Sequence, residues 1–383
     1  MNQRIVIAGC EFTTLRILVF AGILRVLIRR EKKSSHWHGF DKLVLIWNLS
    51  GTLMYTIQYG TLAAFINRCG VMYDSLGIYW IFRNFFQTFE DIASVIKMFA
   101  ICALISTPLV TAEKINSASP FSFFGPVGAS FHRGRFQCAG PFPHYIMMGC
   151  FWISLIPLFY GAYKAKINPL LNMTAIFCSI ALVYFSASST PLLTGAGIVL
   201  FWQCYKSRAQ GKKIFYITCL LILILHFVMQ VPVWHLLSRV NIFGGSTGWH
   251  RYYLFDQFVK HASEWFLFGT KSTEHWGEGL VDVTNQYVLE AVRGGSITLI
   301  FFLFIMYNAI KICGRNSLAL AEQPIHWLSW GVGISMLGHA VSFWGVSYFG
   351  QILMLFYMTL AMTGFLHERN NHCEFNTHEG EKT

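Results

Sequence analysis

The densest group of chemically active side chains lies between Val281 and Gly295, just before the apolar run 297–306. Its charged and amide members recur every three or four residues: Asp282, Gln286, Glu290 and Arg293. Read as a helix, this spacing places all four on one face. A carboxylate or guanidinium carried toward hydrocarbon is costly unless it faces protein or water. We therefore interpret this face as one wall of a solvated site, with an interfacial turn among lipid headgroups as the alternative.

A second group of cations surrounds two glycine turns: His132, Arg133, Gly134, Arg135, Gly140 and His144. Guanidinium groups bind phosphate oxygens in pairs and stay charged at any physiological pH. The glycines let the backbone come close to a ligand, so the loop is predicted to bind a diphosphate. The alternative is that Arg133 and Arg135 are ordinary interface anchors. Their place on the outer face, derived below, runs against the positive-inside bias and favours the binding role.

A third group follows a stretch rich in Gly, Ser and Thr: Trp249, His250, Arg251 and Asp256. The apolar spacing after that stretch predicts a short amphipathic helix on the membrane surface. Aromatic rings beside polar side chains suit a sugar-binding cleft, because pyranose faces stack on rings, but they suit a headgroup belt equally well. The hydroxyl run 186–191 is interpreted as a helix-hairpin turn, with the lining of a cavity as the alternative.

The composition indicates which kind of protein must position these groups. With 54% apolar and only 12% charged residues in 383, the chain has too few charges for a soluble domain of this size. It is predicted to be an all-α, polytopic integral membrane protein. The net charge of +11 is no evidence for a nucleic-acid partner, because Lys and Arg concentrate in the cytoplasmic loops of membrane proteins. The ten cysteines support neither a disulfide framework nor a metal site.

About eleven transmembrane helices in a single domain, 1–366, are predicted from apolar segments near 1–28, 42–64, 70–87, 92–111, 142–163, 169–187, 189–205, 213–231, 286–311, 325–344 and 347–366. The first could instead be the stub of a longer chain. Basic loops at 164–166, 206–213 and 311–315 are two spans apart and are assigned to the cytoplasm. The weak segment 70–87 must then span, which puts the long loops 112–141 and 232–285 on the outer face. The polar tail 367–383 is predicted to be cytoplasmic and disordered.

The order of these motifs resembles the O-antigen ligase/polymerase superfamily, and more closely its bacterial exopolysaccharide and oligosaccharide polymerases. The resemblance rests on the basic loop, on an arginine early in a large later loop, and on the loop exit Asp282-Val-Thr-Asn-Gln-Tyr287 with Gly294-Gly295 beyond it. It implies a glycosyltransferase of the bacterial inner membrane whose active face is periplasmic. Its partners would be a polyprenyl-diphosphate-linked oligosaccharide, a glycan or lipid acceptor and membrane lipids, with no metal ion or other cofactor.

The resemblance also implies roles for single residues. Arg133 and Arg135 would hold the diphosphate, and Arg251 would neutralise charge on it as it leaves. The ligases usually place a histidine before the asparagine of the loop exit, where this chain has Thr284, and this departure argues against a ligase and against a histidine base there.

The chemistry itself requires a base for the acceptor hydroxyl. Asp282 is the first candidate and Glu290 the second, with Asp256 and His250 as weaker ones. Asn285, Gln286 and Tyr287 are predicted to orient acceptor hydroxyls, and His144, His250 and Arg293 to bind substrate.

Two other functions remain open at this point. A transporter could use the outer arginines and the polar helix to line a path for an anionic solute or a lipid-linked sugar. A transporter, however, needs binding groups near the bilayer midplane, whereas the polar groups here cluster toward one face. A non-catalytic subunit that only binds the carrier lipid would also fit the missing histidine.

Overall fold

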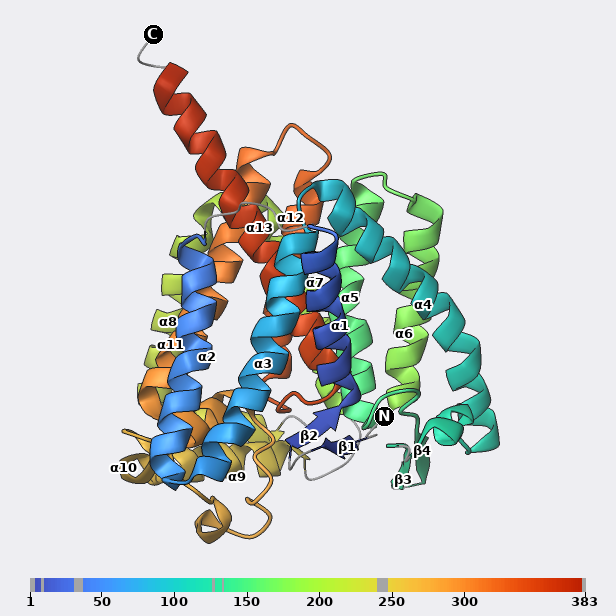
Figure 1. Cartoon of the computed structure of the whole chain (residues 1–383). Coiled ribbons are helices and arrows are strands. Elements are labelled where there is room, and N and C mark those ends of the chain that lie inside the picture. Colours follow the sequence, from blue (N-terminus) through green and yellow to red (C-terminus); the bar gives the residue numbers. More distant parts are fainter. Residues whose placement is uncertain are drawn as a thin grey trace.

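The computed structural model describes residues 4–7, 10–30, 37–125, 128–132, 134–239 and 247–380. Most of this part is α-helix, and the long helices lie alongside one another in a bundle (Figure 1), which confirms the all-α prediction. Among the described residues, five helical segments are long and apolar enough to cross a membrane: Phe89–Asn116, Tyr145–Lys164, Pro169–Ser186, Ser189–Val228 and Gln286–Ala319. The chain is therefore a membrane protein, while eleven as the number of spans stays a prediction.

Each of the eleven predicted apolar segments corresponds mainly to one helix, although the bounds differ: α1 (Thr14–Ile28), α2 (Gly39–Tyr59), α3 (Leu62–Phe85), α4 (Phe89–Asn116), α5 (Tyr145–Lys164), α6 (Pro169–Ser186), α7 (Ser189–Gln203), α8 (Gly211–Val228), α11 (Gln286–Ala319), α12 (His326–Ser342) and α13 (Gln351–Gly380). The helix of the first segment, α1, begins only at Thr14 and is therefore shorter than the predicted segment 1–28. An antiparallel hairpin of β1 (Arg4–Ile7) and β2 (Cys10–Thr13) precedes α1. The Thr13 side chain then caps α1 by accepting a hydrogen bond from the Arg16 backbone N–H at 3.3 Å, which fixes the helix start.

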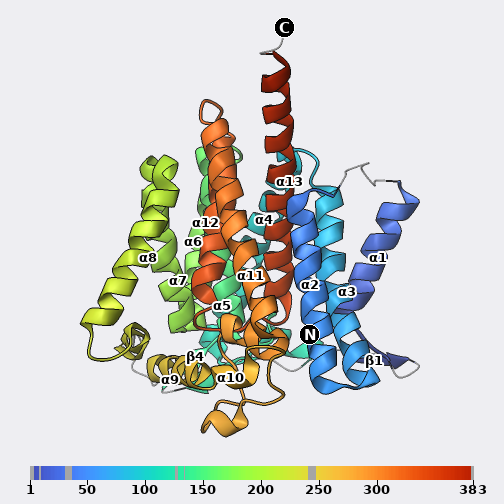
Figure 2. The same cartoon turned by 90° about the vertical axis from the view of Figure 1, so that its left-hand side faces the viewer.

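Both long loops gather at the same end of the bundle, which we call the loop end (bottom of Figures 1 and 2). The first carries η1 (Pro120–Phe124), β3 (Ser130–His132) and β4 (Arg135–Gln137). The second carries η3 (Val233–Arg239), α9 (Thr247–Lys260), α10 (Ala262–Trp265) and η4 (Glu274–Trp276). Helix α9 confirms the predicted short helix after the Gly/Ser/Thr stretch. The short η2 (Cys204–Gln210) joins α7 to α8 at the opposite end.

The predicted disordered tail is helical as far as the structure describes it, because α13 continues through His367 to Gly380. No proline or glycine interrupts the tail before Gly380, so a helix that is already formed and packed can extend into polar sequence at little cost. Disorder of the tail 367–383 stays a prediction.

A buried charge network ties α2, α3 and α13 together at the end opposite the loops. The Arg83 guanidinium contacts the Asp41 carboxylate at 3.1 Å and the Glu368 carboxylate at 2.8 Å. The Tyr79 hydroxyl also donates to Asp41 at 2.6 Å. Because both carboxylates are almost fully buried, their pairing with Arg83 fixes how α3 and α13 pack on α2.

The first long loop is fastened to α4 by a buried carboxylate. Both oxygens of Glu113, which has no exposed surface, accept backbone N–H groups, from Ala139 and from Gly140, each at 3.0 Å. The neighbouring Lys114 ammonium donates to the Phe136 carbonyl at 2.6 Å. These bonds fix the segment that leads from β4 into α5.

Helix α11 is broken near its start at Gly295, whose φ of 66° and ψ of −172° are not helical. The backbone of residues 266–270 docks onto this break. The Ser296 N–H donates to the Phe266 carbonyl at 2.9 Å, and the Thr270 N–H donates to the Val292 carbonyl at 2.9 Å. A Cβ on Gly295 would lie 2.2 Å from the Leu267 carbonyl oxygen, so this close approach requires glycine. The break separates a short polar piece, 286–294, from the long apolar part of the helix.

Candidate functional site

The polar piece of α11 begins at Gln286, later than the sequence spacing predicts. Asn285 caps the helix: its side-chain oxygen accepts the backbone N–H groups of Tyr287 at 2.9 Å and Val288 at 3.2 Å. Asp282 therefore lies in the loop before the helix, where it is exposed, and not on the face that carries Gln286 and Glu290. The single four-residue face predicted from Asp282 to Arg293 is wrong in this respect.

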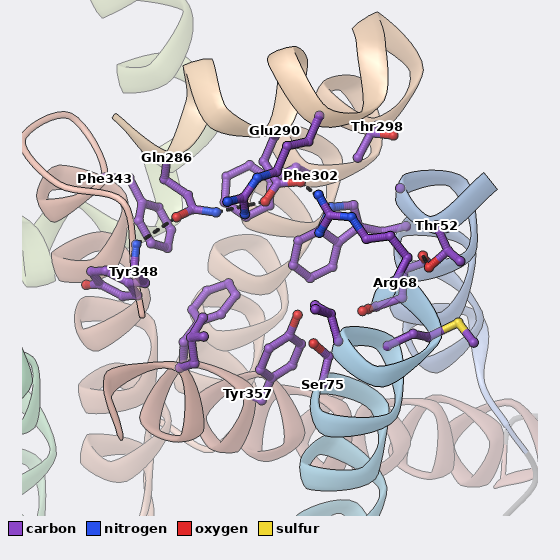
Figure 3. Close-up of a pocket in the computed structure, with 18 residues that line it drawn as sticks. Thr52, Arg68, Ser75, Gln286, Glu290, Thr298, Phe302, Phe343, Tyr348 and Tyr357 are labelled. Atoms are coloured by element: carbon purple, nitrogen blue, oxygen red, sulfur yellow. Dashed lines mark hydrogen bonds between the residues drawn. The ribbon is translucent and has the colours of Figure 1, made fainter. Parts of the chain in front are cut away.

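The Glu290 carboxylate is held from two sides by neutral donors. The Gln286 amide donates to one oxygen at 2.8 Å, and the Trp47 indole N–H donates to the other at 3.1 Å. The Gln286 carbonyl oxygen in turn accepts the Tyr348 backbone N–H at 2.9 Å, which ties the group to the α12–α13 loop. These three bonds fix the carboxylate in one orientation, as Figure 3 shows.

Glu290 lines a cavity of about 130 Å³ between α2, α3, α11 and the start of α13 (Figure 3). Aromatic rings form much of its wall: Trp47, Phe302, Phe343, Tyr348, Phe356 and Tyr357. Its polar lining, besides Glu290, comes from Asn48, Thr52, Arg68, Ser75, Gln286, Arg293 and Thr298. A cavity with ring faces, amides and hydroxyls around one carboxylate has the chemistry of a sugar site.

Two arginines flank this carboxylate without pairing to it. Arg68 of α3 and Arg293 of α11 lie close enough to interact electrostatically with each other and with Glu290. Within the described part of the chain, neither makes an ion pair with a carboxylate, and the buried Arg68 Nε has no hydrogen-bond partner. Guanidinium groups with spare N–H donors beside an open cavity can bind a phosphate or diphosphate.

The structure also brings four of the predicted residues together in a second cluster at the loop end: His144, His250, Arg251 and Asp282. The Asp282 carboxylate acts electrostatically on both imidazoles, and Arg251 acts on His250. His144 is the N-cap of α5, and its Nδ1 accepts the Ile146 N–H at 3.2 Å. This cluster therefore combines cationic groups with one carboxylate.

Arg251 of α9 is 8% exposed and already hydrogen-bonded. Its Nη2 donates to the Thr190 hydroxyl at 2.7 Å and to the Ser189 hydroxyl at 3.4 Å. The run 186–191 is the turn between α6 and α7, in agreement with the first interpretation of it, and two of its hydroxyls bind Arg251. Arg251 thus fastens α9 to the start of α7.

Burial sets the protonation behaviour of the second cluster. It lowers the pKa of His144, while the Asp282 charge opposes that shift. It also lowers the pKa of His250, where Asp282 again opposes and Arg251 adds to the shift. Burial lowers the pKa of Arg251 as well, although an arginine stays charged at neutral pH. Both histidines are therefore disposed to be neutral at pH 7.

The loop between α12 and α13 connects the two clusters. Its Phe343 carbonyl accepts the Gln286 backbone N–H at 2.9 Å, on the cavity side. On the other side, a Cβ on Gly345 would lie 3.2 Å from the Arg251 Cζ. This loop therefore contacts both clusters and sets their separation.

Other predicted residues have different positions. Tyr287 donates its hydroxyl to the Ala340 carbonyl at 2.8 Å and packs against rings of α11 and α12. Asn285, which is 2% exposed, caps α11, so both side chains already have hydrogen-bond partners within the protein, and their contact with an acceptor stays a prediction. Arg135 lies exposed on β4, and Arg133 lies outside the described residues.

Among the groups that act on Glu290, sequence reasoning missed Arg68 and Trp47. Arg68 lies about two turns past the α2–α3 connection, where an arginine looks like a flanking charge of a membrane helix. Its one available signal was its place on the outer side of the predicted topology, against the positive-inside bias. Nothing in the sequence connects Trp47 with Glu290.

Within the described residues, no group of three or more His, Cys, Asp or Glu side chains is placed to hold a metal ion. Comparison with known proteins adds no relative: no protein-family model matches the chain, and no curated protein is significantly similar to it.

Proposed function

We propose that this protein is a membrane glycosyltransferase that polymerises or ligates glycans carried on polyprenyl diphosphate, at the periplasmic face of a bacterial inner membrane. The observation that carries the proposal is the oriented Glu290 carboxylate in an aromatic and polar cavity flanked by Arg68 and Arg293, neither of which is paired with it. A base, two cations and ring faces are what transfer from a sugar diphosphate requires.

In the proposed reaction an acceptor hydroxyl oxygen attacks C1 of the donor sugar. The C1–O bond to the diphosphate breaks, its electron pair leaves with the lipid diphosphate, and the hydroxyl proton passes to Glu290. Arg68 and Arg293 stabilise the charge that grows on the leaving group. Glu290 takes the place of Asp282 as the proposed base, because Asp282 is exposed in a loop beside two histidines.

The second cluster, with Arg251, His144 and His250, lies next to the cavity across the α12–α13 loop and is proposed to contact the rest of the glycan. Exposed Arg135 would contribute from the first long loop. The basic loops at the opposite end of the bundle support the proposed orientation, because Lys and Arg favour the cytoplasmic side.

The test is reconstitution of the purified protein with a polyprenyl-diphosphate oligosaccharide and a chelator, with products resolved by size. The Glu290→Gln variant should lose about 100-fold or more in rate, the usual contribution of a general base. Glu264→Gln is the matched control. Glu264 also accepts an indole N–H, from Trp276 at 2.9 Å, but it lies in the second long loop and does not line the cavity. Equal activity of the two variants would refute the role of Glu290.

The wild-type result also discriminates between functions. A ladder of longer glycans supports a polymerase. Substrate binding without any product, with and without added acceptor, would favour a non-catalytic subunit that binds the carrier lipid. Absence of binding would favour the transporter.

A further inference from the structure

We propose that an isoprenoid diphosphate reaches the Glu290 cavity from the side of the bundle, over a cationic edge with its own binding residues. We name this edge the tyrosine rim and define it by Tyr55, Tyr59, Arg68, Lys271 and Arg293. The inference rests on the proposed function, since it takes a lipid diphosphate as substrate, and it adds Lys271 and residues 266–268 to the site.

The rim is built from two stacked rings and the cations that cover them. Tyr55 and Tyr59, one turn apart on α2, stack with ring centroids 4.4 Å apart. The Arg68 Cζ lies 3.9 Å from the Tyr55 centroid, and the Lys271 ammonium lies 5.7 Å from the Tyr59 centroid. The Tyr59 hydroxyl donates a hydrogen bond to the Lys271 carbonyl at 3.1 Å, which anchors the second long loop to α2. The rings hold the two cations by their faces and leave their N–H groups available.

The positive charge of the rim is not neutralised. In the described part of the chain, Arg68, Lys271 and Arg293 form no ion pair with a carboxylate. This contrasts with Lys260, paired with Asp256 at 2.7 Å, and with Arg83, paired twice. Arg68 and Arg293 are also close enough to repel each other. Three cations near the one carboxylate of Glu290 leave an excess of positive charge at the rim, which favours binding of a multiply charged anion.

An exposed apolar edge continues directly from the rim. Phe266, Leu267 and Phe268 are 54%, 64% and 46% exposed. Backbone hydrogen bonds hold this segment against α11, from Ser296 N–H to the Phe266 carbonyl and from Thr270 N–H to the Val292 carbonyl, each 2.9 Å. The segment leads within three residues to Lys271. The exposed apolar segment therefore leads along the chain to Lys271 and is bonded to the part of α11 that carries Arg293, which lines the cavity.

The chemistry of the rim selects among anionic ligands. Inorganic diphosphate would use the three cations but not residues 266–268. An ordinary phospholipid carries one phosphate and would use fewer of the cations. A diphosphate on a single isoprenoid chain matches both parts, with the diphosphate at the rim, the first sugar directed into the cavity, and the chain along residues 266–268.

Binding to the full-length protein in nanodiscs tests this inference, with farnesyl diphosphate and inorganic diphosphate as probes. We expect wild type to bind farnesyl diphosphate about tenfold or more tightly than inorganic diphosphate, as burial of a few methylene groups would give. Lys271→Ala should weaken both probes by about tenfold, the usual value of one charge-assisted contact. Leu267→Ser should weaken farnesyl diphosphate alone. Lys260→Ala, an exposed lysine of the same loop, is the control and should change neither.

The outcomes separate the possible ligands. Equal affinity for the two probes would show that the site takes free diphosphate and would overturn the isoprenoid assignment. Full competition by anionic phospholipid vesicles at the same concentration would show a general headgroup site and would also overturn it. An unchanged affinity in Lys271→Ala would remove the rim from the binding site.

Failure of this inference is distinguishable from failure of the proposed function. If the reconstituted enzyme extends glycans while Lys271→Ala binds and reacts as wild type does, the function stands and the side entry is refuted. If Lys271→Ala and Leu267→Ser shift binding as expected while wild type forms no product with any acceptor, the rim stands and the transfer reaction is refuted.

Discussion

Replacement of Asn285 separates a structural role from a role in substrate binding. Its side-chain oxygen accepts two backbone N–H groups of the first turn of α11, from Tyr287 and Val288. Asn285 is 2% exposed and Val288 is fully buried, so water cannot replace the lost acceptor in Asn285→Ala. Loss of a cap costs about 1 kcal/mol, and buried orphan donors add to it, so we expect a loss of about 2 kcal/mol. The same turn carries Gln286 and Glu290, and its fraying should lower transfer activity in parallel.

Asn285→Ser is the matched variant, because serine caps about as well as asparagine but has no amide to offer a sugar. We expect it to keep most of the stability and most of the activity. The assay is thermal unfolding of the purified variants in detergent, followed by tryptophan fluorescence, beside the reconstituted transfer reaction. If both variants unfold like wild type while both are inactive, the amide contacts substrate and the capping argument is refuted.

Three further predictions concern single contacts. Gly295→Ala should destabilise the protein by about 1–3 kcal/mol, because its φ is positive and the added Cβ would overlap the Leu267 carbonyl; thermal unfolding would measure this. Burial lowers the pKa of His144, so below its ordinary pKa of about 6.5 the unfolded chain binds more protons than the folded one. Stability should therefore be constant above about pH 6.5 and fall as pH drops, and His144→Asn, which can still cap α5, should flatten that slope in unfolding curves measured across pH. Trp47→Phe removes the indole donor to Glu290 but keeps a ring, so transfer should slow by about tenfold in the reconstituted assay with little change in unfolding temperature.

The position of the cavity explains why the polar groups of this chain lie toward one end of the bundle. Gln286, Glu290 and Arg293 all precede the break at Gly295, and the rest of α11 is mostly apolar. Arg68 lies near the start of α3, and the α2–α3 turn is at the loop end (Figure 2). The charged groups thus stay near one face, where water can reach them, and the buried Arg83 network occupies the opposite end.

The sequence by itself determined the helices, because a segment that crosses hydrocarbon must satisfy its backbone internally and must be apolar over most of its length. The sequence also carries the signals for the start of α11 and for its break, because Asn285 is a typical N-cap and Gly294-Gly295 is a typical helix break. The predicted polar face is too long because the four-residue spacing continues past this cap to Asp282. The same sequence signals predicted the short helix α9 and the hydroxyl turn at 186–191.

Only the tertiary structure decided which polar groups meet. Arg68, Trp47 and Glu290 come from three different helices, and a pattern along one helix carries no information about the facing helix. The close approach of residues 266–270 to Gly295 likewise depends on how a long loop folds back, which no local periodicity encodes. Helix spacing could place Gln286 and Arg293 beside Glu290 on one polar face, whereas packing alone added the Trp47 indole donor and the Arg68 cation.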